Sequence, residues 1–158
     1  MTRPPMTFVG NDPYPRRRGD WADLGRAAAQ LLAEREKGYP AMVAAQKLAQ
    51  ALADARIRVM RAVVAIWRVV LNDDALPEPN EFQAHFGATW EEMREDLDRA
   101  AARARELARR HRDNRDAAVQ AELVEALAWQ HQPVCAGSGP HTWLSHDYQQ
   151  WERRRAAS

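Results

Sequence analysis

The sequence predicts an all-α fold, a helical bundle built on a long antiparallel helix hairpin. Residues 53–71 are apolar on almost every side of a helix, apolar residues elsewhere recur at spacings of three and four, and no segment alternates like a strand. The polar side chains around 53–71 fall on one narrow stripe: Lys47, Gln50, Asp54, Arg58, Arg61, Arg68 and Asn72. A helix with so thin a polar edge is expected at the centre of the molecule, surrounded by other helices.

The bulk composition indicates one globular domain and excludes several function classes. The chain has 158 residues, of which 46% are hydrophobic, and its net charge of +1 is too small to indicate nucleic-acid binding by itself. It has no apolar run long enough for a membrane span, and its first residues lack the apolar segment of a signal peptide. The single cysteine, Cys135, leaves no internal disulfide, and we expect a cytoplasmic protein.

The first half of the chain predicts an arm followed by two helices. Residues 1–19 contain four prolines and an arginine triplet, and we expect an extended basic arm there. A first helix is predicted from Asp20 to Lys37, with Gly38 as its stop, and a second over residues 40–72. The short joint between them makes the two helices antiparallel neighbours.

The second half predicts shorter elements and a tail. Asn80 and Gln83 resemble a capping box for a helix over 81–86, and Thr89 and Glu92 form another that opens a helix at residue 90. A helix over about 116–131 follows, either after a break near Asn114 or as part of one helix from 90 to 131. The bundle domain therefore spans 20–131, and residues 132–158 form an irregular tail with a short helix at about 145–155.

One segment carries a resemblance to a known group of proteins. Its matching residues lie between positions 35 and 63: Arg35-Glu36, Tyr39-Pro40, Val43-Ala44, Lys47-Leu48, Ala53-Asp54, Arg56-Ile57, Met60 and Ala62-Val63. This segment resembles one found in short helical proteins of phages and prophages of GC-rich bacteria. The resemblance implies a lineage and no mechanism. Such segments usually carry a turn where this chain has Gln46, Ala49 and Leu52, so we expect the helix to continue through 46–49. If the turn is kept instead, the region divides into three short helices.

The residues suited to binding lie at the two ends of the chain. Trp, Tyr and Arg dominate the energetics of protein interfaces, and both appendages are rich in them. The candidate partner-binding residues are Arg16, Arg17, Arg18, Trp143, Tyr148, Trp151, Arg153 and Arg154. Because we find no catalytic constellation and expect no cofactor, the sequence favours a non-enzymatic interaction protein that binds a larger protein or nucleoprotein assembly, or a second copy of itself.

Two alternatives remain open from the sequence. A helical end rich in arginine suits a phosphate backbone, and the candidate nucleic-acid contacts, with the basic arm in support, are Arg99, Arg103, Arg105, Arg109, Arg110 and Arg112. A zinc ion takes Cys and His ligands in a tetrahedral shell. The only cluster of such residues is His131, Cys135, His141 and His146 in the tail.

Overall fold

The predicted all-α class is confirmed. The computed structural model describes residues 15–72, 74–135 and 139–157, and these residues form helices with no strand beyond an isolated bridge between Pro133 and Pro140. The helices are η1 (Arg16–Gly19), α1 (Trp21–Ala44), α2 (Gln50–Asn72), η2 (Pro79–Glu81), α3 (Phe82–Phe86), α4 (Trp90–Arg110), α5 (Arg115–Gln130) and α6 (His141–Ala157). Within this described part, none of the helices has the combination of length and apolar character that a membrane crossing requires.

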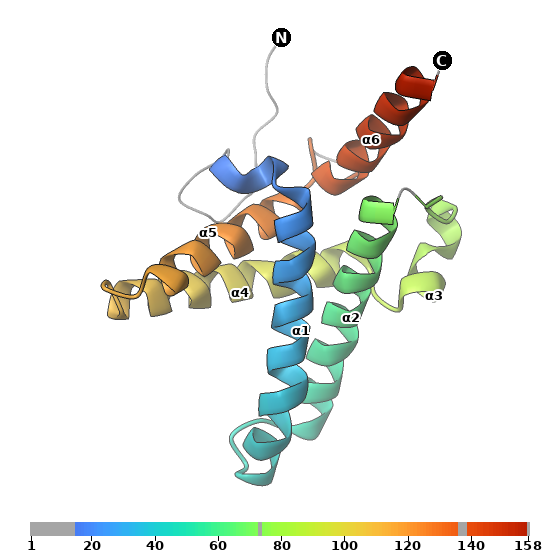
Figure 1. Cartoon of the computed structure of the whole chain (residues 1–158). Helices are drawn as coiled ribbons and strands as arrows, with labels where there is room; N and C mark the ends of the chain where they lie inside the picture. The colour runs from blue at the N-terminus through green and yellow to red at the C-terminus, as the bar shows by residue number, and fades with distance from the viewer. Residues whose placement is uncertain (1–14, 73, 136–138, 158) are drawn as a thin grey trace.

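Two helix pairs and one projecting helix make up the architecture (Figure 1). Helices α1 and α2 lie side by side and antiparallel, and α4 and α5 form a second antiparallel pair that crosses behind α1. Helix α3 lies beside the C-terminal part of α2, and α6 starts near the end of α5 and projects away from the other helices.

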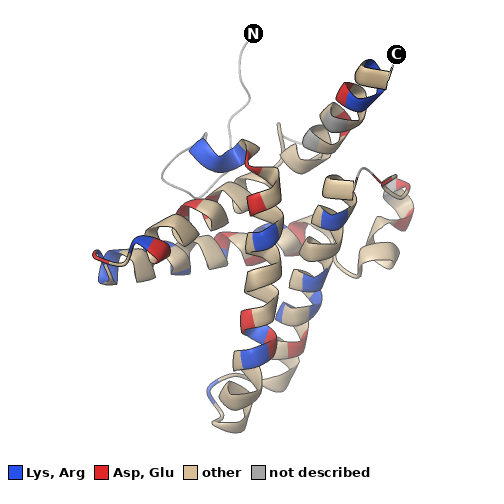
Figure 2. Ribbon diagram, viewed as in Figure 1, with Lys and Arg blue, Asp and Glu red and all other residues tan. Residues whose placement is uncertain are grey.

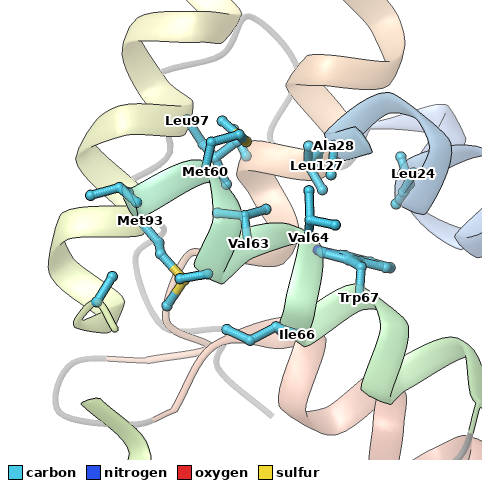
Figure 3. Close-up of a cluster of buried hydrophobic side chains, with 14 of the residues drawn as sticks. Leu24, Ala28, Met60, Val63, Val64, Ile66, Trp67, Met93, Leu97 and Leu127 are labelled. Carbon is cyan, nitrogen blue, oxygen red and sulfur yellow. The ribbon is translucent and has the colours of Figure 1, made fainter. Parts of the chain in front are cut away.

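Helix α2 is the centre of the hydrophobic core, as the sequence predicts. Val63 and Ile66 are fully buried and Val70 is 1% exposed, because α1, α3, α4 and α6 all pack against this helix. Figure 3 shows the side chains that meet there, which come from α1, α2, α4 and α5: Leu24, Ala28, Met60, Val63, Val64, Ile66, Trp67, Met93, Leu97 and Leu127.

The polar stripe predicted beside this core is exposed along its whole length. Figure 2 shows basic residues along α2, and two of its arginines find acidic partners on other helices. Arg58 contacts Glu92 of α4 at 2.6 Å, and Arg61 lies 3.9 Å from Glu36 of α1. Their charges are thus compensated at the surface, and none has to be buried unpaired.

The predicted boundary between the first two helices is wrong. Helix α1 does not stop at Gly38 but continues through Pro40 to Ala44, and the chain turns at residues 45–49, where we expected continuous helix. The turn closes with a Schellman motif, in which the Lys47 amide donates to the Met42 carbonyl at 2.9 Å and the Gln46 amide to the Val43 carbonyl at 3.0 Å. Gln46 holds the left-handed position of this motif, with φ of 59°.

A small second core explains why the turn lies there. Tyr39 and Leu48 are each 9% exposed and Ala53 is 1% exposed, and they pack together across the turn. Continuing α1 past Gly38 brings Tyr39 onto this cluster, and turning at 45–49 brings Leu48 back to meet it. The gain from burying these apolar side chains outweighs the local signals of Gly38, Pro40 and Gln46.

The α3–α5 region follows the predicted signals with one exception. Thr89 and Glu92 form the predicted capping box at the start of α4, and the chain breaks between α4 and α5 at Asn114, whose side chain accepts from the Ala117 amide at 3.2 Å. The capping box predicted at Asn80 is wrong. In the described structure Asn80 lies inside η2, and α3 begins later, at Phe82, without a side-chain cap.

Both ends of the described chain are more ordered than predicted. Residues 16–19 are not extended, because they form η1, which packs against α5; residues 1–14 of the predicted arm lie outside the described residues. The terminal helix is not short, since α6 begins at His141 and has 17 residues. Its start is held by contacts to the rest of the fold, which the sequence pattern does not reveal.

Candidate functional site

The first turns of α6 are anchored to the rest of the protein by one face of the helix. Thr142 and His146, four residues apart, are 1% and 2% exposed. The Nε2 atom of His146 lies 2.6 Å from the carbonyl oxygen of Asp74, and the His141 ring stacks on Trp129 with centroids 3.8 Å apart. Burial lowers the pKa of His141 to about 4, so the ring that stacks is neutral near pH 7.

Trp143 is half-buried and contacts the main core beside this anchoring face. Its ring meets that of Trp90 edge-on at 6.3 Å. Together with Phe82 and Pro140, these two rings line a cavity of about 470 Å³. Trp143 therefore joins α6 to the start of α4.

The opposite face of α6 presents a row of large apolar side chains, which we call the α6 stripe. Its members are Leu144, Tyr148 and Trp151, which are 52%, 53% and 46% exposed. They are spaced at i, i+4 and i+7, so they follow one face of the helix. Thr142 and His146 lie half a turn away, which explains how the helix is both attached and exposed.

Two members of the stripe contact each other and neighbouring side chains of α6. The rings of Tyr148 and Trp151 are 5.9 Å apart, and the Arg155 guanidinium lies 5.3 Å from the Trp151 ring centroid. Tyr148 donates its hydroxyl to Glu152 at 2.8 Å, a hydrogen bond that raises the pKa of the phenol. Large rings held in fixed positions lose little conformational freedom when a partner covers them.

The charge around the stripe is predominantly positive towards its C-terminal end. Arg153, Arg154 and Arg155 are all exposed and follow Trp151 after Glu152, which with Asp147 makes two acids beside three arginines (Figure 2). Of the arginines that the sequence singled out, Arg154 lies beside the apolar row, three residues after Trp151. Arg153 lies seven residues after His146 and therefore on the opposite face of α6.

The arginine triplet near the N-terminus is engaged by the protein itself. Arg16 and Arg17 both bind Glu122 of α5 at 2.8 Å, and Arg18 donates to the carbonyl of Pro15 at 2.9 Å. The Gln130 side chain in turn donates to the Arg18 carbonyl at 2.6 Å. These contacts attach η1 to α5, whereas the stripe belongs to α6. The N-terminal arginines that were predicted to bind a partner therefore hold η1 on the bundle.

The arginines of the nucleic-acid alternative do not form one uniform face. Arg105 turns towards α5 and pairs with Glu125 at 3.1 Å, while Arg109 and Arg110 bind Glu106 at 2.5 and 3.2 Å. Arg112 is exposed beyond the end of α4. The remaining two, Arg99 and Arg103, line a separate cavity between α1, α4 and α5.

The four residues of the zinc alternative are not brought together. The Trp67 indole donates to Nε2 of His131 at 3.0 Å, His141 stacks on Trp129, and His146 contacts a backbone carbonyl. Cys135 is half-buried in the turn that precedes α6. Within the described ranges, no group of three or more His, Cys, Asp or Glu side chains is placed to hold a metal ion.

Comparisons with protein families, curated proteins and solved structures find no match to this chain. One member of the stripe, Leu144, was missed in the sequence, although its spacing of four and seven residues from Tyr148 and Trp151 was visible there. The missing information was the direction of the helix, which depends on the buried contacts of Thr142 and His146.

Proposed function

We propose that this protein is a non-enzymatic interaction protein that binds a larger protein or nucleoprotein assembly through the α6 stripe. The observation that carries the proposal is the exposure of Leu144, Tyr148 and Trp151 in one row on a helix that projects from the bundle. Trp, Tyr and Arg are the residue types that supply most of the binding energy at protein interfaces. A helix that presents anchors at i, i+4 and i+7 suits an apolar groove on a partner.

The chemistry of the partner follows from the residues around the row. Arg154 and Arg155 follow Trp151 at i+3 and i+4, and the Arg155 guanidinium lies over its ring, so the matching groove has an apolar floor and acidic residues at one end. With the phage-like segment at 35–63, this favours a protein of phage or mobile-element type that acts in the host cytoplasm, on a counter-defence target or on the machinery of DNA metabolism.

The test is capture of partners from host lysate on the immobilised full chain and on three variants. We expect Trp151→Gln and Leu144→Gln to lose a partner that the wild type retains, with at least tenfold weaker binding on re-measurement with the purified partner. Leu52→Gln is the matched control, because Leu52 is 43% exposed but lies on α2. Equal retention by all four proteins would refute the role of the stripe.

The same variants distinguish a foreign partner from a second copy. Light scattering after size exclusion would show a dimer that Trp151→Gln converts to monomer if the stripe binds itself. That result would replace the proposed partner by another copy of this chain.

Nucleic-acid binding is the second candidate, supported by the exposed arginines Arg109, Arg110 and Arg112 at the α4–α5 end (Figure 2). A gel-shift series with single-stranded and duplex DNA tests it. Affinity that falls steeply with salt and is lost in the Arg109→Glu/Arg112→Glu variant would favour it. Arg105 is left unchanged, since charge reversal there would disrupt its contact with Glu125.

A further inference from the structure

A cavity of about 480 Å³ lies in the corner where α1 crosses the α4–α5 pair (Figure 1). Cavities of this size commonly hold small organic ligands. It is built from the C-terminal half of α1, residues 96–107 of α4 and the first half of α5, with Arg56 contributed by α2. None of its lining residues belongs to α6, so it is independent of the proposed partner surface.

The inner wall of the cavity is apolar. Leu31 and Met42 line it from α1, Ala104 and Leu107 from α4, and Val124 from α5. Leu107 is 41% exposed, and Leu31 and Met42 are only half-buried, so apolar area on three helices remains accessible in one concave place. Such a wall favours hydrocarbon over water.

The rim of the cavity is cationic. Arg56, Arg99 and Arg103 line it, and the only acids among the lining residues of the described chain are Glu34 and Asp96. Asp96 is already compensated, because Arg35 binds both of its carboxylate oxygens at 2.6 and 2.9 Å. Arg99 and Arg103 are four residues apart on one face of α4, and Arg103 has no ion pair within the described residues.

Two residues that line the cavity have a buried side-chain nitrogen atom without a hydrogen-bond acceptor in the described part of the chain. Nε of Arg56 and Nε2 of Gln120 are buried, and neither has a hydrogen-bond partner among the described residues. Buried polar atoms are nearly always hydrogen-bonded in folded proteins. Both groups are donors, and the arginines of the rim are positively charged donors, so the lining favours a ligand with negatively charged acceptor atoms.

We propose that this cavity binds an amphipathic anion, a molecule with one oxyanion headgroup on an unbranched hydrocarbon body. The headgroup is a carboxylate or a phosphate monoester held by Arg56, Arg99 and Arg103, since guanidinium groups bind both with paired hydrogen bonds. The hydrocarbon lies along Leu31, Met42 and Val124. A hydrophilic anion would leave this apolar wall in contact with water, and a neutral lipid would give Arg103 no ion pair.

The first test uses methionine methyl groups as local reporters in the full chain. Met42 lines the cavity, whereas Met60 and Met93 are fully buried in the main core. Protein labelled with ¹³C at the methionine methyls is titrated with decanoate, decyl phosphate and decanol below their micelle concentrations. We expect saturable movement of the Met42 signal with the two anions, unchanged Met60 and Met93 signals, and at least tenfold weaker binding of decanol.

The two headgroups are separated within the same titration. Tighter binding of decanoate assigns a carboxylate ligand, and tighter binding of decyl phosphate assigns a phosphate monoester. Inorganic phosphate and acetate, which lack the hydrocarbon, are expected to leave Met42 unmoved. A Met42 signal that none of the amphiphiles moves, or an equal affinity for decanol, would overturn the proposal.

Variants then test the arginines. Arg103→Gln and Arg99→Gln are each expected to weaken decanoate or decyl phosphate at least tenfold, while thermal unfolding verifies that both variants fold. Arg110→Gln is the matched control, because Arg110 is exposed on the same helix and does not line the cavity. Affinity unchanged in the Arg99→Gln/Arg103→Gln double variant would also overturn the proposal.

Discussion

The Trp67 indole N–H donates a hydrogen bond to Nε2 of His131 at 3.0 Å, at a point where both side chains are 1% exposed. This contact joins α2 to the end of α5 across the main core. Because Nε2 accepts, the ring is neutral and carries its proton on Nδ1. Burial lowers the pKa of His131 to about 3, well below the ordinary value near 6.5.

This buried histidine predicts that the protein loses stability as the pH falls. Between pH 6.5 and the folded-state pKa of about 3, the unfolded chain binds a proton at His131 that the folded protein does not. The stabilising contribution of neutral His131 is therefore fully present above pH 7. Below pH 6, protonation of this histidine in the unfolded chain lowers the free energy of unfolding by about 1.4 kcal/mol per pH unit. Urea unfolding at pH 7, 6, 5.5 and 5 measures it.

The variant His131→Gln tests whether His131 causes this pH dependence of the free energy of unfolding. Glutamine keeps an acceptor for Trp67 but does not titrate, so the decrease between pH 7 and 5 should become shallower by the contribution of one histidine. His111→Gln is the control, since His111 is exposed after the end of α4, and it should retain the wild-type slope. Equal slopes in the two variants would contradict the assignment.

The pair Arg35–Asp96 predicts a large loss of stability when one partner is removed. Asp96 is 2% exposed and Arg35 13%, and two hydrogen bonds join them. Asp96→Ala leaves a guanidinium largely buried without its acid, which costs about 3–5 kcal/mol. Asp23→Ala breaks the exposed pair with Arg26 and should cost less than about 1 kcal/mol. Chemical denaturation of both variants gives the comparison.

A double variant separates the value of the pair from the cost of breaking it. Arg35→Met/Asp96→Leu replaces both charges by apolar side chains, and we expect it to unfold less easily than Asp96→Ala alone. A decrease of less than about 1 kcal/mol in the free energy of unfolding of Asp96→Ala would contradict this prediction, because it would mean that water compensates Arg35 once its acid is removed.

The parts of the fold that were predictable are those with a strong local signal. The apolar sides of residues 53–71 define a central helix, and Thr89 with Glu92 fixes where α4 begins. Both signals act within a few residues, through helical periodicity and capping bonds. The break near Asn114 was one of two options, and its capping bond to Ala117 decides it.

The features that the sequence did not predict depend on contacts between distant residues. Burial of Tyr39 with Leu48 places the turn at 45–49, against the signals at Gly38 and Pro40. No residue near Trp143 in the sequence indicates that it packs on Trp90, so the sequence could not predict which face of α6 is attached to the bundle. The apolar wall and arginine rim of the 480 Å³ cavity likewise come from four helices and appear only after folding.

The conformation of Gln46 predicts a simple stabilising substitution. Its φ of 59° lies in the left-handed region, which costs a residue with a Cβ about 1–2 kcal/mol and glycine almost nothing. Gln46→Gly should therefore raise the free energy of unfolding by about 0.5–1 kcal/mol, after the greater flexibility of glycine in the unfolded chain is deducted. Ala45→Gly is the control: φ is −83° there, so it should destabilise. A loss in both variants would show that the Gln46 side chain itself stabilises the turn.

Two glycines inside α1 predict opposite responses to the same substitution. A Cβ at Gly38 would meet no atom within 4 Å, whereas a Cβ at Gly25 would lie 2.6 Å from Cδ1 of Leu71, where α1 approaches α2. Gly38→Ala should therefore stabilise the protein by about 0.5–1 kcal/mol, the usual gain inside a helix. In Gly25→Ala the Leu71 side chain has to leave its preferred rotamer, at a cost of about 0.5–1.5 kcal/mol, and the gain should disappear. Thermal and urea unfolding of the two variants measure this difference, and an equal gain in both would mean that Leu71 moves aside freely.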